Sequence, residues 1–312
     1  MIAPPGPAEA QRAGVGRAIV AVLISMACFS VGDTVMKFAT ARMPVGEMIT
    51  IRSVFAIGLA LAVALHFGAG LSGAGLRHPV FWLRAVLEAA VTALFVSLLG
   101  KLTLGDMTTL AQMIPILMTA FAAVFLREAV GWRRWAATLT GFAGVVVVAR
   151  PGAEGLNVWA LAALFCAALV AARDLLTRQL PPQIRAGTVS VASSVAALAA
   201  GLGLGLFETW RAPTGAEIAL AALAAAMTTG GNLGLIVAMR AADVSLVAPF
   251  RYSVIPFAFL AGFLVFDERP DAYGLIGIAL IVGSGLYTLH RERVRSRERR
   301  EAARPVGPPP SP

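Results

Sequence analysis

Charged residues are scarce in this sequence. They make up 14% of its 312 residues, whereas hydrophobic residues make up 58%. Soluble domains carry nearer a quarter charged residues, because their outer surface must face water. A chain this apolar cannot cover its exterior with polar groups, so a lipid bilayer is the solvent that fits its composition.

The motifs of metal and nucleotide chemistry are also missing. The two cysteines, Cys28 and Cys166, lie in separate apolar runs and form neither a CxxC pair nor a zinc-ligand spacing. The three histidines are scattered without an HExxH motif, and no GxxxxGK[ST] loop is present to bind a nucleotide. The sequence therefore predicts no metal site and no cofactor.

Three other classes of membrane protein are weaker alternatives for the same reason. A membrane-embedded enzyme would need a nucleophile with its base, or a cluster of metal ligands. A channel would need a filter-like loop, and a sensor or scaffold would need a larger soluble domain. None of these features is seen in the sequence.

Long apolar runs, by contrast, fill most of the chain. A spanning helix needs about 20 such residues, and turn or charge signals such as "SGAGLRHP" and "RPGAEG" separate the runs. The run after Arg17 is too long for a cleavable signal and is interpreted as the first membrane helix. The predicted spans are 18–39, 45–67, 79–99, 106–126, 132–150, 156–178, 187–207, 215–238, 244–266 and 271–289. The predicted fold is an all-α membrane protein with ten transmembrane helices.

Basic residues indicate the orientation. The stretch "HRERVRSRERREAARP" (290–305) holds seven arginines against three glutamates. A basic tail beside the final span is typical of a cytoplasmic anchor on anionic lipid head groups. An even number of spans then predicts that both termini are cytoplasmic. Seven arginines less three glutamates give the tail +4 of the net charge of +9, and no nucleic-acid motif accompanies it.

An internal repeat divides the chain into halves. Asp33 and Lys37 lie four residues apart, and Asp174 and Arg178 repeat that spacing 141 residues later. The same shift carries Pro115 onto Pro256 and brings Glu268 within one residue of Glu128. A duplicated unit of five helices is odd in number, so its second copy must cross the membrane in the opposite sense. Such inverted repeats are typical of alternating-access transporters.

The predicted organisation has four parts. Residues 1–16 are expected to form a disordered cytoplasmic tail, and residues 17–150 the first five-helix repeat. Residues 151–290 form the second repeat, and 291–312 a basic, Pro-rich cytoplasmic tail.

Paired units with a mid-helix proline, followed by an apolar run ending in "LRE" or "FDE", resemble the EamA type of the drug/metabolite transporter superfamily. The stretch "VSLVAPFRYSVIPFAFLAGFLVFDERPD" also resembles a bacterial subgroup that includes riboflavin and S-adenosylmethionine importers. The resemblance implies a carrier in the bacterial inner membrane, with a central cavity between the repeats and coupling to a gradient rather than to ATP. Import of a vitamin-like metabolite such as riboflavin is the first expectation, and export of amino acids, metabolites or drugs is the alternative. The predicted partners are a small-molecule substrate, the bilayer and the proton as coupling ion; a homodimer stays open.

Charges inside the predicted spans are the candidate site residues, because each costs about 3 kcal/mol near the bilayer centre unless it faces a partner or water. The pairs Asp33/Lys37 and Asp174/Arg178 are predicted to close the cavity, one at each membrane face. The alternative is a base that reaches toward the lipid head groups beside an acid on the same helix. Arg84 and Glu88 are likewise four apart, and Glu88 is the first candidate for proton coupling, unless it only pairs with Arg84.

The remaining candidates are polar residues at middle depth. Arg251 is predicted to contact substrate or to pair with a buried acid, beside the amphipathic ring of Tyr252. Pro115 and Pro256 are expected to break backbone hydrogen bonds and line the cavity. Gln112 and Asn232 could bind substrate or join helices. Arg52 is interpreted as a structural base, and Glu128 and Glu268 as polar caps of turns between helices.

Overall fold

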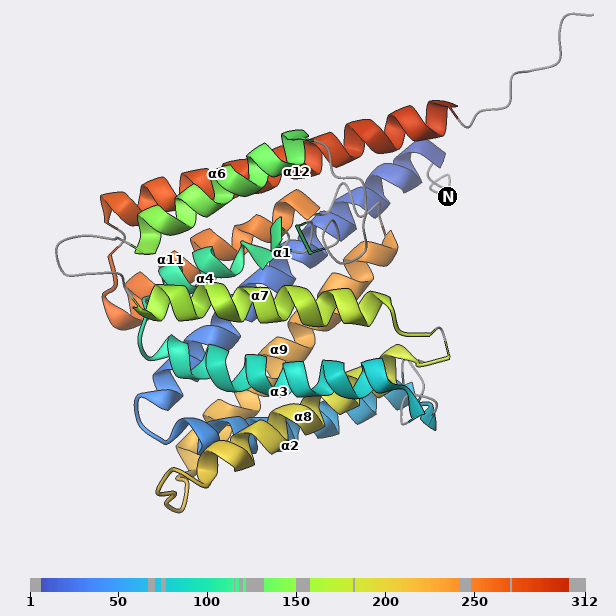
Figure 1. Ribbon diagram of the computed structural model, residues 1–312. Coiled ribbons are helices and arrows are strands. Elements are labelled where there is room, and N and C mark those ends of the chain that lie inside the picture. Colours follow the sequence, from blue (N-terminus) through green and yellow to red (C-terminus); the bar gives the residue numbers. More distant parts are fainter. Residues whose placement is uncertain are drawn as a thin grey trace, which may run out of the picture.

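The computed structural model describes residues 7–66, 71–73, 77–114, 116–117, 120–121, 132–149, 158–181, 183–241, 248–269 and 271–302, and helices joined by short turns make up most of them. Figure 1 shows the helices. They are α1 (Pro7–Thr40), α2 (Val45–His66), α3 (Pro79–Leu99), α4 (Leu104–Ala111), α6 (Trp132–Ala149), α7 (Val158–Arg178), α8 (Ala186–Gly205), α9 (Gly215–Ala241), the 3₁₀ segment η2 (Ala248–Ser253), α11 (Val254–Phe266) and α12 (Ala272–Ala302).

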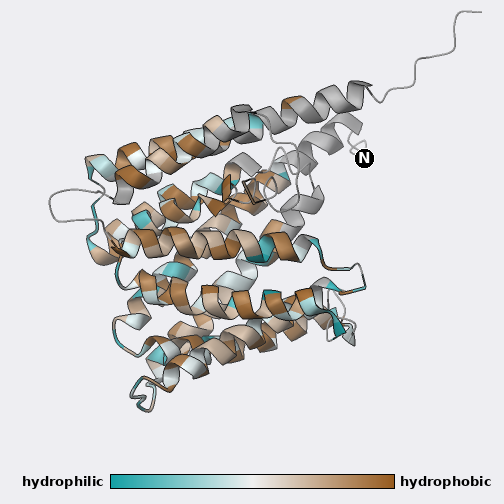
Figure 2. Ribbon diagram, viewed as in Figure 1, coloured by the Kyte–Doolittle hydropathy of each residue, from teal (hydrophilic) through white to brown (hydrophobic). Residues whose placement is uncertain are grey.

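Six of these helices are long and apolar enough to cross a membrane: α1, α2, α3, α7, α8 and α9. Two shorter apolar helical segments, Phe250–Phe266 and Ala272–Ser284, follow them. Apolar residues cover most of the helix surfaces, and hydrophilic residues gather in the connecting loops (Figure 2). The prediction of a multi-pass, all-α membrane protein is therefore confirmed.

Several predicted spans differ from the helices that form. The span predicted at 106–126 begins with α4, which ends after only two turns, and Gln112 is its C-cap rather than an interior residue. The span predicted at 244–266 begins as the 3₁₀ segment η2 and becomes α-helical only at Val254. At the two ends, α1 starts at Pro7, and α12 continues past His290 into the predicted tail.

The helices pack against one another in pairs. α1 packs on α9 and α3 on α7, while α2 contacts α9 and α3 contacts α8. α1 also contacts α11, and α4 contacts α7. Three further pairs are α2 with α8, α4 with α11, and α6 with α12. The last pair lies along one side of the bundle, and the start of α1 and the end of α12 lie at the same end of it (Figure 1).

Small residues allow the closest of these contacts. A Cβ atom added at Gly201 of α8 would lie 2.9 Å from the carbonyl oxygen of Gly46 and 2.8 Å from the backbone nitrogen of Thr50, both in α2. In α6, a Cβ atom at Gly144 would lie 2.8 Å from the Ile281 side chain of α12. Within a bilayer, helices associate through such close packing, because lipid offers no hydrophobic drive between them.

The contact between α2 and α8 predicts opposite effects for two equivalent substitutions in one helix. Gly201→Ala should lower the free energy of unfolding by about 1–3 kcal/mol, because the added methyl group meets backbone atoms. Gly203→Ala is the matched control, because no heavy atom lies within 4 Å of the added Cβ; it should stabilise α8 by about 0.5–1 kcal/mol through helix propensity. Thermal unfolding of the purified protein in detergent measures both, and equal midpoints would contradict the packing.

Candidate functional site

Asp33, Arg52 and Glu88 lie at middle depth in three neighbouring helices. Asp33 precedes the end of α1 by seven residues, and Arg52 follows the start of α2 by seven. At 1.5 Å per residue both are about 10 Å from the same end of the bundle. Glu88 is near the midpoint of α3. These residues therefore lie where water is excluded unless the protein admits it.

Glu88 is bound by two guanidinium groups. Arg84, one turn earlier in α3, donates to Glu88 Oε2 at 3.3 Å, and Arg173 of α7 donates to Glu88 Oε1 at 3.2 Å. Arg173 also donates two hydrogen bonds to Asp174 Oδ1, at 2.7 and 3.0 Å. These four residues, called here the α3–α7 network, join the two helices by ion pairs within the apolar bundle.

Arg84 extends the same network to a third helix. Its Nε donates to Thr177 Oγ1 of α7 at 2.8 Å, and one terminal nitrogen donates to Ser193 Oγ of α8 at 2.9 Å. The residue is 8% exposed. A guanidinium buried to this degree needs such donors satisfied, because an unpaired buried charge costs several kcal/mol.

Arg52 connects the α3–α7 network to α1. Its guanidinium interacts electrostatically with Asp33 and with Glu88. Its Nε atom is buried and has no hydrogen-bond partner among the described residues. The six charges thus alternate in sign from Asp33 through Arg52 and Glu88 to Arg173 and Asp174, with Arg84 beside Glu88.

A second cluster lies where α1 and α11 end and α4 begins. Lys37 of α1 forms an ion pair with Glu268, and its Nζ donates to the Leu102 carbonyl oxygen at 2.6 Å. Glu268 Oε2 in turn accepts a hydrogen bond from Leu104 N at 2.8 Å. The ammonium group lies 5.1 Å from the centre of the Phe266 ring. Lys37 and Glu268, called here the α1–α11 latch, therefore join segments that are far apart in sequence.

A small polar cavity of about 190 Å³ adjoins the α1–α11 latch. Glu268 lines it, together with residues of α4, α11 and the turn before α12: Thr103, Gly105, Asp106, Phe259, Gly262, Arg269 and Asp271. The cavity places the latch next to a space that water can occupy.

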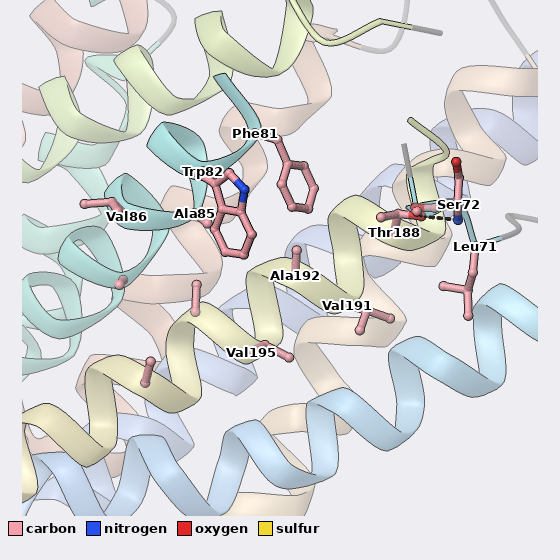
Figure 3. A pocket seen from close by; sticks show the side chains of 14 residues that line it. Leu71, Ser72, Phe81, Trp82, Ala85, Val86, Thr188, Val191, Ala192 and Val195 are labelled. Atoms are coloured by element: carbon pink, nitrogen blue, oxygen red, sulfur yellow. Dashed lines mark hydrogen bonds between the residues drawn. The ribbon is translucent and has the colours of Figure 1, made fainter. Parts of the chain in front are cut away.

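A larger groove of about 670 Å³ lies between α3 and α8. Trp82 and Phe81 of α3 form one wall with their rings edge to face, and Val191 and Val195 of α8 form the opposite wall (Figure 3). At one end Ser72 N donates to Thr188 Oγ1 at 2.7 Å. Its volume is in the range of small-molecule sites, which are mostly apolar with a few polar groups.

The α3–α7 network lies next to this groove. Ala85 lines the groove and directly follows Arg84, and Ala192 lines it directly before Ser193. Because neighbouring helical residues are rotated by about 100°, Arg84 and Ser193 point away from the groove and toward the interior of the bundle, where they form a hydrogen bond. Their hydrogen bond therefore joins α3 to α8 beside the groove.

Of the three predicted ion pairs, one is confirmed, one differs and one involves a side chain outside the described residues. Arg84 and Glu88 pair as predicted, at 3.3 Å. Lys37 does not pair with Asp33; it pairs with Glu268, because the side chain reaches across to α11 instead of along α1. Asp174 pairs with Arg173, and the Arg178 side chain lies outside the described residues. The interpretation of Glu268 as a cap is confirmed by its hydrogen bond to Leu104 N.

The other candidates are distributed more widely than predicted. Arg251 of the 3₁₀ segment η2 is exposed, while Tyr252 is buried at 8% exposure in a cluster with Ala18, Val22 and Met26 of α1. Pro256 is in the first turn of α11, where a missing N–H breaks no helical hydrogen bond, so it does not interrupt the helix. Asn232 is exposed on α9. Pro115 and Glu128 lie outside the described residues.

Sequence reasoning missed Arg173, which binds both Glu88 and Asp174. The signal was present, because Arg173 is a base inside a predicted span and directly precedes Asp174. Spacing along a single helix could not predict its role, because its partner Glu88 is 85 residues away in the chain. Thr177 and Ser193, the hydroxyl partners of Arg84, give no comparable signal in an apolar helix.

The α3–α7 network predicts a large effect for Arg173→Gln. Among the described residues, the substitution leaves Asp174 without an ion-pair partner and Glu88 with one, so the free energy of unfolding should fall by about 3 kcal/mol. Arg269→Gln is the control, because Arg269 pairs with Asp267 at 3.7 Å with side chains that are 76% and 82% exposed; an exposed pair contributes about 0–1 kcal/mol. Thermal unfolding in detergent compares them, and equal midpoints would show that the network contributes nothing.

Comparisons with known proteins agree with this architecture. The model of the EamA-like transporter family matches residues 16–150. A riboflavin transporter of Rhizobium johnstonii is 32% identical over 93% of this chain and 96% of its own. An S-adenosylmethionine uptake transporter of Rickettsia bellii is 25% identical over 87% and 92% of the two chains. A pseudopaline exporter of Pseudomonas aeruginosa is 28% identical over 85% and 92%.

A solved crystal structure shares the fold. It superposes with a TM-score of 0.59 at 22% identity, over 88% of this chain and 98% of that one. These relatives are transporters that match nearly the whole chain, and their likeness extends through both halves of the bundle. The protein is a multi-pass membrane transporter, not an enzyme, and it belongs to the EamA-like transporter family.

Proposed function

We propose that this protein is a secondary active transporter that moves a small metabolite by alternating access between two inverted five-helix halves. The halves are 17–150 and 151–290, with 1–16 and 291–312 as the terminal segments. The observation that carries the proposal is that charged residues bridge the two halves at two separate levels of the bundle: Glu88 to Arg173, and Lys37 to Glu268.

The pattern of helix contacts supports the inverted repeat. If α1, α2, α3, α4 and α6 correspond to α7, α8, α9, α11 and α12, exchanging the halves turns the pair α1–α9 into α7–α3. It also turns α2–α9 into α8–α3 and α1–α11 into α7–α4. The pairs α2–α8, α4–α11 and α6–α12 turn into themselves. All of these contacts occur, as a two-fold axis between the halves requires.

The two charged bridges act as latches in this proposal. Separating α3 from α7 breaks the ion pairs of Glu88 and Arg173 and opens one end of the bundle. Separating α1 from α11 breaks the pair of Lys37 and Glu268 and opens the other end. Each latch lies beside a cavity, the 670 Å³ groove in the first case and the 190 Å³ cavity in the second. One chain carries both latches, so the proposal needs no second copy.

The positions of the two termini and of basic residues at the helix ends support one membrane orientation. The start of α1 and the end of α12 lie at one end of the bundle (Figure 1). Arg77 and Arg185 flank helices that begin there, and the positive-inside rule assigns an end rich in such residues to the cytoplasm. We therefore place both termini in the cytoplasm of a bacterial inner membrane, with the α1–α11 latch toward the outside.

Import of riboflavin is the substrate assignment that we propose. It is supported by the likeness to the riboflavin transporter of Rhizobium johnstonii across 93% of this chain. Export is the second candidate, because the pseudopaline exporter covers 85% of the chain at 28% identity. Alternating access is compatible with either direction, since the gradients of solute and coupling ion decide it.

Uptake by a bacterial strain that requires riboflavin and lacks its own importer tests this function. Expression of this protein should restore growth at low riboflavin, and Lys37→Gln should reduce the rescue because it removes the outer latch. Arg42→Gln, which changes an exposed base just after α1 that lines neither cavity, should rescue as well as the natural sequence. Protein present in the membrane without any rescue would contradict riboflavin import and favour a screen for exported metabolites.

The same assay tests proton coupling through Glu88. If a proton moves inward with the substrate, uptake should be faster at mildly acidic than at mildly alkaline external pH. Glu88→Gln should remove that difference, because an amide cannot exchange a proton in this range. An unchanged pH profile in Glu88→Gln would leave Glu88 as a structural member of the α3–α7 network.

A further inference from the structure

Asp33 and Arg52 differ from the other charges in the middle of the bundle. Among the described residues, neither takes part in a hydrogen bond or a close ion pair through its side chain, although each acts electrostatically on the other. Arg84, Glu88, Arg173 and Asp174 form a continuous chain of hydrogen bonds, from Arg84 to Glu88, Arg173 and Asp174. Lys37 is bonded to Glu268. Asp33 and Arg52 are therefore an acid and a base that take part in neither the α3–α7 network nor the α1–α11 latch.

The orphaned donor in this pair is a specific one. Arg52 Nε is buried without a partner, and the hydroxyl groups of Ser30 in α1 and Ser53 in α2 are buried without partners as well. A buried polar group without a partner is costly and needs a reason, such as a role in binding. The Arg52 guanidinium interacts with nearby opposite charges, but its Nε–H donates no hydrogen bond among the described residues. That N–H is therefore available to donate to a bound solute.

We propose that Asp33 and Arg52 form the substrate-recognition pair of the transporter. The inference rests on the proposed function. Asp33 offers an acceptor and Arg52 a donor at the same depth on adjacent helices. A solute with an N–H group beside a carbonyl group, as in a cyclic imide or amide, satisfies both at once. The N–H donates to the Asp33 carboxylate, and the carbonyl oxygen accepts from Arg52.

The balance of charge indicates that this solute has no net charge. Leaving aside Lys37 and Glu47, which lie in terminal turns of α1 and α2, the described side chains of α1, α2, α3 and α7 inside the bundle include three arginines, Arg52, Arg84 and Arg173, and three acids, Asp33, Glu88 and Asp174. A bound anion or cation would add a charge that nothing in this set compensates, at a depth where an uncompensated charge is strongly disfavoured. An uncharged solute leaves the balance intact while it fills the two open hydrogen-bonding positions.

Binding to the purified full-length protein tests the pair. The probes are riboflavin, which is uncharged and carries a cyclic imide, its phosphorylated form, which is an anion, and S-adenosylmethionine, which carries a net positive charge. Quenching of flavin fluorescence measures the first two, and calorimetry measures the third. We expect riboflavin to bind best, and Arg52→Gln and Asp33→Asn each to weaken its binding at least about tenfold.

Two further variants separate recognition from folding. Arg52→Lys keeps the positive charge but loses the planar donor, so riboflavin binding should fall while thermal unfolding stays near that of the natural sequence. Arg42→Gln should bind riboflavin normally, because its side chain is exposed and lines neither cavity. Loss of binding in Arg52→Gln alone, with Arg52→Lys unchanged, would reduce the role of Arg52 to its charge and overturn the donor assignment.

The outcomes also distinguish this inference from the proposed function. If the natural sequence binds none of the three probes, the proposed substrate class fails, and the pair fails with it. If it binds riboflavin but Arg52→Gln and Asp33→Asn bind it equally well, the pair is overturned while the proposed function stands. Equal binding of the phosphorylated flavin would overturn the argument from charge balance.

Discussion

A charged side chain can remain inside an apolar helix bundle only if an opposite charge or a hydrogen-bonding group is held against it. This constraint shapes the centre of the protein. Arg84 cannot be buried without Glu88, Thr177 and Ser193, and Glu88 in turn holds Arg173. Because Thr177 and Arg173 belong to α7 and Ser193 to α8, satisfying these charges also determines which helices meet.

The same constraint explains how such a bundle can change shape. Ion pairs between halves are strong only while the helices hold them in the right geometry, and water can replace a partner when a cavity opens beside them. The Glu88–Arg173 and Lys37–Glu268 contacts lie at different levels and next to different cavities. Two such contacts can be exchanged for water one at a time, which is the physical requirement of alternating access.

Much of the fold could be predicted from the sequence, because long apolar runs and turn signals are local properties. The spans at α2, α3, α7 and α8 begin and end close to the predicted residues. The fourth predicted span contains a helix end at Ala111 and the ninth contains the 3₁₀ segment η2, because apolar composition does not reveal where a helix is interrupted. Pro256 shows the same limit: its effect depends on its distance from the helix start.

The candidate site was less accessible to prediction, because its bonds join residues far apart in the chain. Spacing within one helix revealed the Arg84–Glu88 pair, but it assigned Lys37 to Asp33 rather than to Glu268, 231 residues away. Arg173 was missed for the same reason. The 141-residue repeat in the sequence points to paired halves, but which side chains meet between them is decided by the crossing of the helices.

Reciprocal opening of the two ends is the central claim, and cysteine labelling tests it most directly. In a background with Cys28 and Cys166 replaced by alanine, single cysteines at Phe259, beside the α1–α11 latch, and at Ala192, in the groove, report on the two ends. Breaking the latch with Glu268→Gln should increase the labelling rate at position 259 and decrease it at position 192. Rates that rise together, or that do not change at either position, would contradict alternating access between these two ends.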